Sequence, residues 1–197
     1  MLDHLDQLTV ISGLQMRIAL YEDMKAYKQL YELLSDGLYR FSYSMVRSAE
    51  VAEEIVSDVF IKLWQMRARL SEIDNLRVYL YTIARNCSLN YLERNADSRV
   101  IGLENLDSGA FAEGANPADL CISADLANQM RRIVQQLPPQ CRLIFQLVRE
   151  EGLRYKEVAA ILDVSPYTVR NQLAIAIQKL GEASLLKGIL FKGVAEK

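Results

Sequence analysis

The sequence is poor in the side chains that build metal sites and nucleophilic centres. Its 197 residues include one histidine and three cysteines, which are Cys87, Cys121 and Cys141. No two of these residues have the close spacing of a zinc site or of a cysteine and histidine nucleophile, and there is no glycine-rich phosphate loop. We therefore expect no metal, no cofactor and no catalytic residue. The protein is not predicted to be an enzyme or to have a small-molecule substrate.

A strong charge of one sign and a long apolar run are missing as well. The formal net charge is −2, whereas a domain that binds nucleic acid through its own charge is usually basic. No apolar run approaches the roughly 20 residues that a membrane span needs, and the sequence begins with no signal peptide pattern. Scattered single cysteines are typical of a reducing compartment. We therefore expect a cytoplasmic protein.

Residues 153–180 have the pattern of two helices joined by a tight turn. Asp163 tolerates the left-handed backbone that such a turn requires, and Pro166 suits the first position of the next helix. A small residue, Ala159, and a branched residue, Val169, would let the two helices cross closely. The pattern favours a DNA-binding helix-turn-helix, and an ordinary helical hairpin is the alternative.

The exposed side of the second helix favours DNA binding. Its polar side chains can form hydrogen bonds with base edges or phosphates, and they are Tyr167, Thr168, Arg170, Asn171, Gln172 and Gln178. No acidic residue lies between Ser165 and Lys179. Residues 131–179 hold eight basic residues against four acidic ones, although the whole chain is slightly acidic. A compact C-terminal domain could concentrate this charge on one face. The acidic balance of the whole chain argues against tight DNA binding by the protein alone and leaves room for a protein partner.

Residues 49–66 form the strongest predicted amphipathic helix. One side is apolar and predicted to be buried; the opposite stripe consists of Glu54, Asp58, Ile61, Lys62 and Gln65. Ile61 is an apolar residue among charged ones, as in a protein contact with a buried anchor and a polar rim. A solvated face with one stray isoleucine is the alternative, and the stripe alone does not decide between them.

Residues 75–95 are predicted to form another helix, rich in tyrosine, arginine and asparagine. Aromatic residues mixed with arginine are typical of a platform for single-stranded nucleic acid; here they include Arg77, Tyr79, Tyr81, Arg85 and Asn86. A tyrosine-rich core helix is the alternative. Nearer the N-terminus, a helix is predicted over 14–34, with a break at Asp36 and Gly37.

These patterns predict an all-α protein with two small helical domains joined by a flexible linker, the C-terminal domain being a helix-turn-helix. Residues 97–122 are predicted to be the linker, since they are acidic and show little periodicity. The expected domains are therefore 1–96 and 123–184, followed by a tail over 185–197.

Three stretches give the chain a family resemblance: AEEIVSDVFIKLW, VYLYTIARNCSLNYL and LPPQCRLIFQLVREEGLRYKEVAAILDVSPYTVRNQLAIAIQKL. In this order and spacing they resemble the extracytoplasmic-function (ECF) sigma factors of the sigma-70 family. The stretch LQMRIALYEDMKAYKQLYELL resembles the Bacteroidetes branch. The resemblance implies a sigma factor that binds RNA polymerase core and directs promoter recognition, melting and transcription initiation. It also implies control by an anti-sigma factor, often a membrane protein in this family.

The resemblance assigns roles to three groups of residues. The stripe Glu54, Asp58, Ile61, Lys62 and Gln65 would bind the clamp helices of the polymerase core. A pocket for a flipped base of the single-stranded minus-ten element would involve Met66, Leu70 and Asn86, with Arg77, Tyr79, Tyr81 and Arg85 contacting the strand nearby. Duplex DNA at the minus-thirty-five element would be bound by Lys156, Tyr167, Thr168, Arg170, Asn171, Gln172, Ala174 and Lys179.

The sequence departs from the family pattern at two places. The family often has basic residues late in the recognition helix, where this chain has AIAIQK; either DNA shape replaces those contacts or these residues face the domain core. Arg154 stands where the family usually has a serine or threonine cap. Two other classes compete with the sigma factor: a stand-alone helix-turn-helix regulator that binds duplex operator DNA as a dimer, and a purely protein-binding adaptor.

Overall fold

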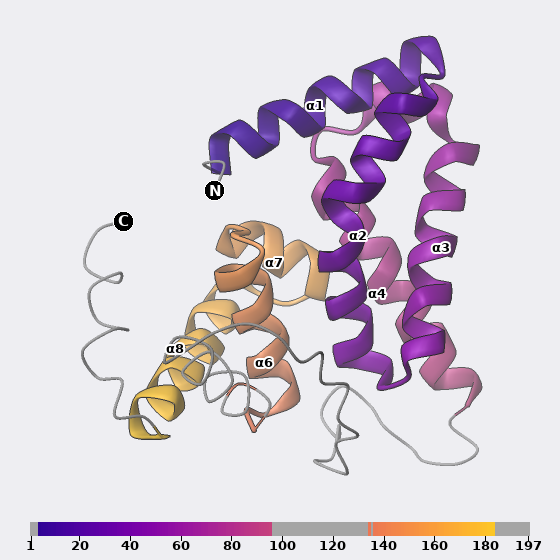
Figure 1. Ribbon diagram of the computed structural model, residues 1–197. Helices are drawn as coiled ribbons and strands as arrows, with labels where there is room; N and C mark the ends of the chain where they lie inside the picture. Colours follow the sequence, from indigo (N-terminus) through magenta and orange to yellow (C-terminus); the bar gives the residue numbers. More distant parts are fainter. Residues whose placement is uncertain (1–3, 96–133, 135, 184–197) are drawn as a thin grey trace, which may run out of the picture.

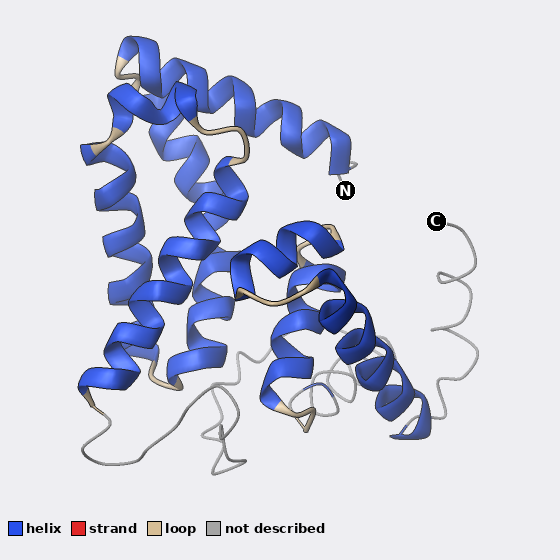
Figure 2. Ribbon diagram, turned by 180° about the vertical axis from the view of Figure 1, so that it is seen from behind, coloured by secondary structure: helices blue, strands red, loops and turns tan. Residues whose placement is uncertain are grey.

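A computed structural model describes residues 4–95, 134 and 136–183 of the chain, and this part is helical without any strand (Figures 1 and 2). The first unit contains α1 (His4–Tyr21), α2 (Met24–Val46), α3 (Ala49–Gln65), η1 (Arg67–Glu72) and α4 (Leu76–Arg94). The second unit contains α6 (Pro139–Phe145), η4 (Gln146–Glu150), α7 (Tyr155–Leu162) and α8 (Pro166–Ala183). The all-α prediction is confirmed. The predicted linker and tail lie outside the described residues.

Side-chain caps set the helix starts in the first unit. The carboxylate of Asp23 accepts hydrogen bonds from the backbone N–H groups of Lys25 and Ala26 at the start of α2. Ser48 caps α3 in the same way, and Asn75 caps α4. These bonds satisfy N–H groups that have no partner within their own helix.

The predicted break at Asp36 and Gly37 is wrong, because α2 runs through both residues. The break comes earlier, at Glu22, whose φ of 49° ends α1 just before the Asp23 cap. Gly37 instead allows Glu151 and Tyr81 to pack closely against α2. A Cβ atom added there would lie 2.6 Å from a carboxylate oxygen of Glu151 in the second unit and would also collide with the hydroxyl of Tyr81.

In the second unit, α7 and α8 form the predicted helix-turn-helix. Asp163 has the left-handed backbone that ends α7, with a φ of 57°, and the Ser165 hydroxyl accepts a hydrogen bond from the backbone N–H of Thr168 at 3.0 Å. Ala159 and Val169 are both buried where the two helices cross. The turn chemistry read from the sequence therefore forms as expected.

The two units are packed directly against each other. Helix α7 lies beside α4, and α6 lies beside α2 (Figure 1). The buried apolar residues of both units belong to one continuous cluster, which extends from Ile18 in α1 through Leu80 in α4 to Leu173 in α8. Helix α1 crosses one end of the first unit and contacts η1 and α2.

Candidate functional site

The predicted protein-contact stripe is exposed along α3. Its five residues, Glu54, Asp58, Ile61, Lys62 and Gln65, all face solvent, and Ile61 is 52% exposed. The opposite side of α3 is buried in the core. Behind the stripe, the hydroxyl of Tyr27 donates to the backbone oxygen of Phe60 at 3.0 Å, and the ring of Tyr27 packs edge-on against Trp64. The stripe therefore lies on a helix that aromatic packing holds in place.

An open hollow of about 410 Å³ lies between the end of α3 and the outer side of α4. Three of the predicted minus-ten residues line it: Met66, Tyr79 and Asn86. The remaining lining residues are Lys62, Gln65, Ile83, Cys87 and Asn90. Ile83, Cys87 and Asn90 are not among the residues predicted for this site. Their spacing from Tyr79 and Asn86 follows one face of a helix, which is the signal that could have identified them.

The Tyr79 hydroxyl lies 2.9 Å from the sulfur of Met66, and the ammonium group of Lys62 lies 3.3 Å from the sulfur of Cys87. These contacts join the α3 and α4 walls of the hollow. It is therefore formed before any ligand enters it, and it offers an aromatic ring, a cation and three side-chain amides. Such a set can stack against a planar group and form hydrogen bonds with its edge.

Two residues predicted to contact the minus-ten strand lie in the core instead. Leu70 is fully buried, and its backbone oxygen accepts a hydrogen bond of 2.6 Å from Gln15 in α1. Tyr81 is 1% exposed, with its ring edge-on to Phe41 at 5.4 Å. The prediction that Leu70 and Tyr81 contact DNA is wrong, because both side chains hold helices of the first unit together.

Burial and the nearby negative charge of Glu151 raise the pKa of Tyr81. Tyr81 therefore offers no exposed polar group of the kind that a strand platform needs. Arg85, another predicted strand contact, is half-buried.

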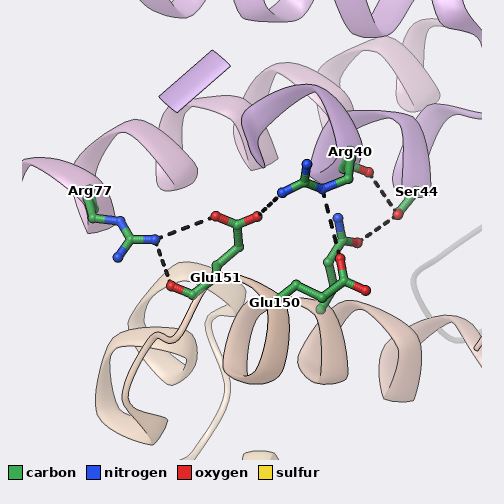
Figure 3. Close-up of polar contacts among 6 residues, drawn as sticks. Arg40, Ser44, Arg77, Glu150 and Glu151 are labelled. Carbon is green, nitrogen blue, oxygen red and sulfur yellow. Dashed lines mark hydrogen bonds and ion pairs between the residues drawn. The ribbon is translucent and has the colours of Figure 1, made fainter. Parts of the chain in front are cut away.

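Arg77 is also buried, with a side chain only 3% exposed, and it pairs with the second unit (Figure 3). One of its terminal nitrogens donates to the backbone oxygen of Glu151 at 2.7 Å and lies 3.5 Å from the carboxylate of that residue. The other carboxylate oxygen of Glu151 accepts a hydrogen bond of 2.7 Å from Arg40 in α2. While the two units are packed together Arg77 is therefore not available to DNA, and its contact with the minus-ten strand stays a prediction.

Most of the predicted duplex-binding residues of the second unit are exposed, and two are partly buried with side chains in contact with other protein groups. Lys156, Tyr167, Arg170, Asn171, Ala174 and Lys179 are exposed. Thr168 and Gln172 are partly buried. The hydroxyls of Thr168 and Ser165 share a hydrogen bond, and the side-chain oxygen of Gln172 lies 2.8 Å from the Cys141 sulfur. The stretch AIAIQK is mixed, since Ala174 and Ile175 are exposed while Ala176 is buried.

Arg154 occupies the N-cap position of α7 in place of a serine or threonine. The side chain of Glu157, three residues later, caps the helix instead. The carboxylate of Glu157 accepts a hydrogen bond of 2.7 Å from the backbone N–H of Arg154. In a capping box, this is the hydrogen bond that the glutamate accepts.

In the part of the chain that the structure describes, no cluster of histidine, cysteine or acidic residues could hold a metal ion. None of its helices is long and apolar enough to span a membrane.

Comparisons with known proteins agree with this arrangement of helices. The family model for sigma-70 region 2 matches residues 30–97, and the model for sigma-70 region 4 matches residues 127–180. The ECF RNA polymerase sigma-E factor of Escherichia coli strain K12 is 30% identical over 158 residues, which are 77% of this chain and 82% of that protein. The ECF RNA polymerase sigma factor SigW of Bacillus subtilis is 25% identical over 158 residues, with 77% of this chain and 84% of SigW covered.

Two solved structures share the fold. The sigma factor RpoE of Bartonella quintana, in complex with the anti-sigma factor NepR, superposes with a TM-score of 0.62 at 23% identity, covering 84% of this chain and 99% of RpoE. CnrH in complex with the cytosolic domain of CnrY gives a TM-score of 0.55 at 19% identity, covering 88% of this chain and 96% of CnrH. The two family models match one after the other along the chain, and a relative that is 30% identical covers 77% of it. The chain therefore belongs to the sigma-70 family and, within it, to the ECF sigma factors.

Proposed function

We propose that this sigma factor binds RNA polymerase core through the α3 stripe, holds a minus-ten base in the hollow beside it, and contacts minus-thirty-five DNA through α8. The geometry around α3 carries the proposal. Lys62 and Gln65 belong both to the exposed stripe and to the lining of the hollow. A protein bound along the stripe would therefore stand at the edge of the hollow, where an unpaired base has to enter.

The core-binding surface is defined by its position around the α3 axis. At about 100° per residue, the five stripe residues occupy one sector of roughly a quarter turn. Glu53 is also exposed but lies about 80° to the other side of Ile61. Ile61 supplies the apolar anchor, and the acidic and polar residues around it form the rim. Glu53 therefore provides a matched control on the same helix.

The proposed base-binding site differs in its residues from the site predicted from the sequence. The hollow supplies Met66, Tyr79 and Asn86, which we retain, and we add Ile83 and Asn90 to them. Extruding a base from its stack costs a few kcal/mol, which contacts in a preformed pocket have to offset. The ring of Tyr79 and the amide of Asn86 are groups that stack on a base and bond to its edge.

The duplex-binding surface is the exposed side of α8. Arg170 and Asn171 carry the groups that most often contact bases in the major groove, and Lys156 and Lys179 suit phosphates. All four side chains are exposed. Residues Ser165 to Lys179 include no acid that would repel the DNA backbone.

We also propose that the protein works in the cytoplasm, where polymerase and promoters are, and that an anti-sigma factor controls it. The fold that it shares with RpoE supports this second point, because RpoE was solved in complex with an anti-sigma factor. A membrane-bound anti-sigma factor would fit the family pattern.

Run-off transcription tests the proposal. Purified core polymerase from the same organism is incubated with and without the protein on a pool of genomic promoter fragments. We expect discrete start sites that depend on the protein. Core binding without any transcript would contradict the promoter assignment. Failure to bind core, together with a shift of duplex DNA by the protein alone, would favour the dimeric regulator.

The α3 assignment has its own test. Ile61→Glu and Asp58→Arg should each weaken core binding about thirtyfold or more, because an interface anchor contributes about 2 kcal/mol or more. Glu53→Arg changes charge by the same amount as Asp58→Arg and should leave core binding unchanged. All three sites are exposed, so thermal unfolding should stay close to that of the native protein. Equal loss in all three variants would reject the stripe as the binding surface.

A further inference from the structure

Polar side chains cross the contact between the two units, beside the apolar cluster that the units share. Four side chains of the first unit reach across it. Arg40 and Arg77 each donate to Glu151 at 2.7 Å (Figure 3). Ser44 donates to the side-chain oxygen of Gln146 at 2.8 Å, and the amide of Asn75 donates to the carboxylate of Glu157 at 2.8 Å. Interfaces between domains of one chain are often of this polar kind, and the domains they join are able to move apart.

Glu151 carries the central carboxylate of this contact. Its side chain is 9% exposed, and its two carboxylate oxygens face Arg40 on one side and Arg77 on the other. The backbone positions it there, because α6 ends in the π-helical turn η4 and the following Gly152 has a φ of 68°. Gly37 leaves room for the carboxylate, since any side chain on that position of α2 would overlap it.

The charges in this cluster balance only while the units are together. Two guanidinium groups, of Arg40 and Arg77, face two carboxylates, of Glu150 and Glu151, and Glu150 lies 3.9 Å from Arg40. Arg77 is almost completely enclosed. A buried ion pair gains little net free energy over solvated groups, but the loss of one partner leaves a buried charge uncompensated. Loss of the Glu151 charge therefore favours separation, in which water reaches Arg77.

The proposed function requires the two units to separate. The elements named minus ten and minus thirty-five are about 25 base pairs apart, which is about 85 Å along duplex DNA. Helical units of this size have radii of gyration of only about 9–12 Å. Two units in direct contact cannot reach both elements together. The packed arrangement is therefore incompatible with simultaneous binding of the two elements.

We propose that the free protein rests in this closed state, held by Glu151 between Arg40 and Arg77, and that opening precedes promoter binding. The inference rests on the proposed function. When only the open fraction binds, the apparent affinity falls in proportion to that fraction. Weakening the Glu151 contact should therefore raise activity, whereas loss of a buried charged residue in an ordinary structural role would lower it.

The test compares Glu151→Gln with Glu150→Gln, the same substitution at the next residue. Glu150 is 42% exposed and lies at the edge of the cluster. Small-angle X-ray scattering of the full chain measures its radius of gyration, and run-off transcription at increasing protein concentration gives the half-maximal point. We expect Glu151→Gln to increase the radius of gyration and to reach half-maximal transcription at a concentration about tenfold lower. Glu150→Gln should resemble the native protein in both measurements.

Gly37→Ala is the second variant, used in particular if Glu151→Gln does not fold. It changes no charge and raises helix propensity in α2, yet its methyl group would overlap both the Glu151 carboxylate and the Tyr81 hydroxyl. It should also expand the protein and lower the half-maximal concentration. Native-like scattering and transcription in both variants would overturn the closed state, as would a native protein that is already extended. If the variants expand but no protein supports transcription, the proposed function fails and the closed state stands.

Discussion

A single isosteric substitution, Asn75→Asp, should break the contact between the units without weakening the helix that Asn75 caps. The side-chain oxygen of Asn75 accepts a hydrogen bond from the backbone N–H of Val78 at 3.1 Å, and this bond starts α4. Its amide nitrogen donates to Glu157 at 2.8 Å. Aspartate keeps the acceptor and caps a helix as well as asparagine does. It replaces the donor with a carboxylate oxygen that faces another carboxylate.

The size of the effect follows from these distances. A hydrogen bond to a charged partner contributes about 1.5–3 kcal/mol. Two carboxylates about 4 Å apart repel by up to about 4 kcal/mol at the effective dielectric constant of a protein surface, before the side chains rotate apart. Since separation of the units relieves the repulsion, we expect the contact to weaken by about 2–3 kcal/mol, or about 30–150-fold. The first unit itself should keep its stability to within about 0.5 kcal/mol.

Hydrogen exchange of the backbone amides in residues 146–157, measured by mass spectrometry, should show the change. Asn75→Asp should speed exchange there. The double variant Asn75→Asp with Glu157→Gln should restore native rates, because the glutamine amide can donate to the new carboxylate while its oxygen still accepts from Arg154. Asn90→Asp, on the exposed side of α4 away from the second unit, is the control. Native exchange in the single variant, or no rescue in the double variant, would refute this account of the contact.

Two further predictions concern the hollow and the junction between α1 and α2. Asn86→Ala should reduce promoter opening, measured by permanganate reactivity of unpaired thymines, by about tenfold with unchanged core binding; equal opening would exclude Asn86 from the base site. The side-chain hydrogen bond from Arg17 and the backbone N–H of Ala26 lower the pKa of Asp23, so its stabilising contribution is present above the ordinary aspartate pKa and is lost as pH falls through the lowered value. The melting temperature of the native protein should fall more steeply below about pH 4 than that of Asp23→Asn; parallel pH profiles would show that this bond does not matter.

Local chemistry explains why the helix-turn-helix could be predicted from the sequence. Asp163, Ser165 and Pro166 each fix a backbone conformation or a cap within a few residues of themselves. The stripe on α3 was predictable for a similar reason, because its buried and exposed sides alternate with the helical period. In both cases the signal and the structure that it determines lie within one or two helical turns.

The roles of Arg77, Tyr81 and Gly37 could not be predicted in this way. Tyrosine and arginine have both apolar and polar parts, so their periodicity along α4 does not separate core positions from exposed ones. The groups that decide are far away in the sequence: Arg77 is buried because Glu151 lies against it, 74 residues later. Glycine after Asp36 suggests a helix break in the local sequence. In the structure, Gly37 is needed because a side chain there would overlap that same distant carboxylate. Pairing between distant elements decides these positions, and a single sequence does not display it.

Glu157 determines whether opening of the protein would also damage its DNA-binding unit. One carboxylate oxygen of Glu157 accepts from Asn75 across the contact, and the other accepts from the backbone N–H of Arg154 in its own helix. Separation of the units breaks only the first bond. The second keeps the start of α7 capped, which compensates for the missing serine or threonine at Arg154. The helix-turn-helix can therefore leave the first unit with its own fold intact, as an opening step before promoter binding requires.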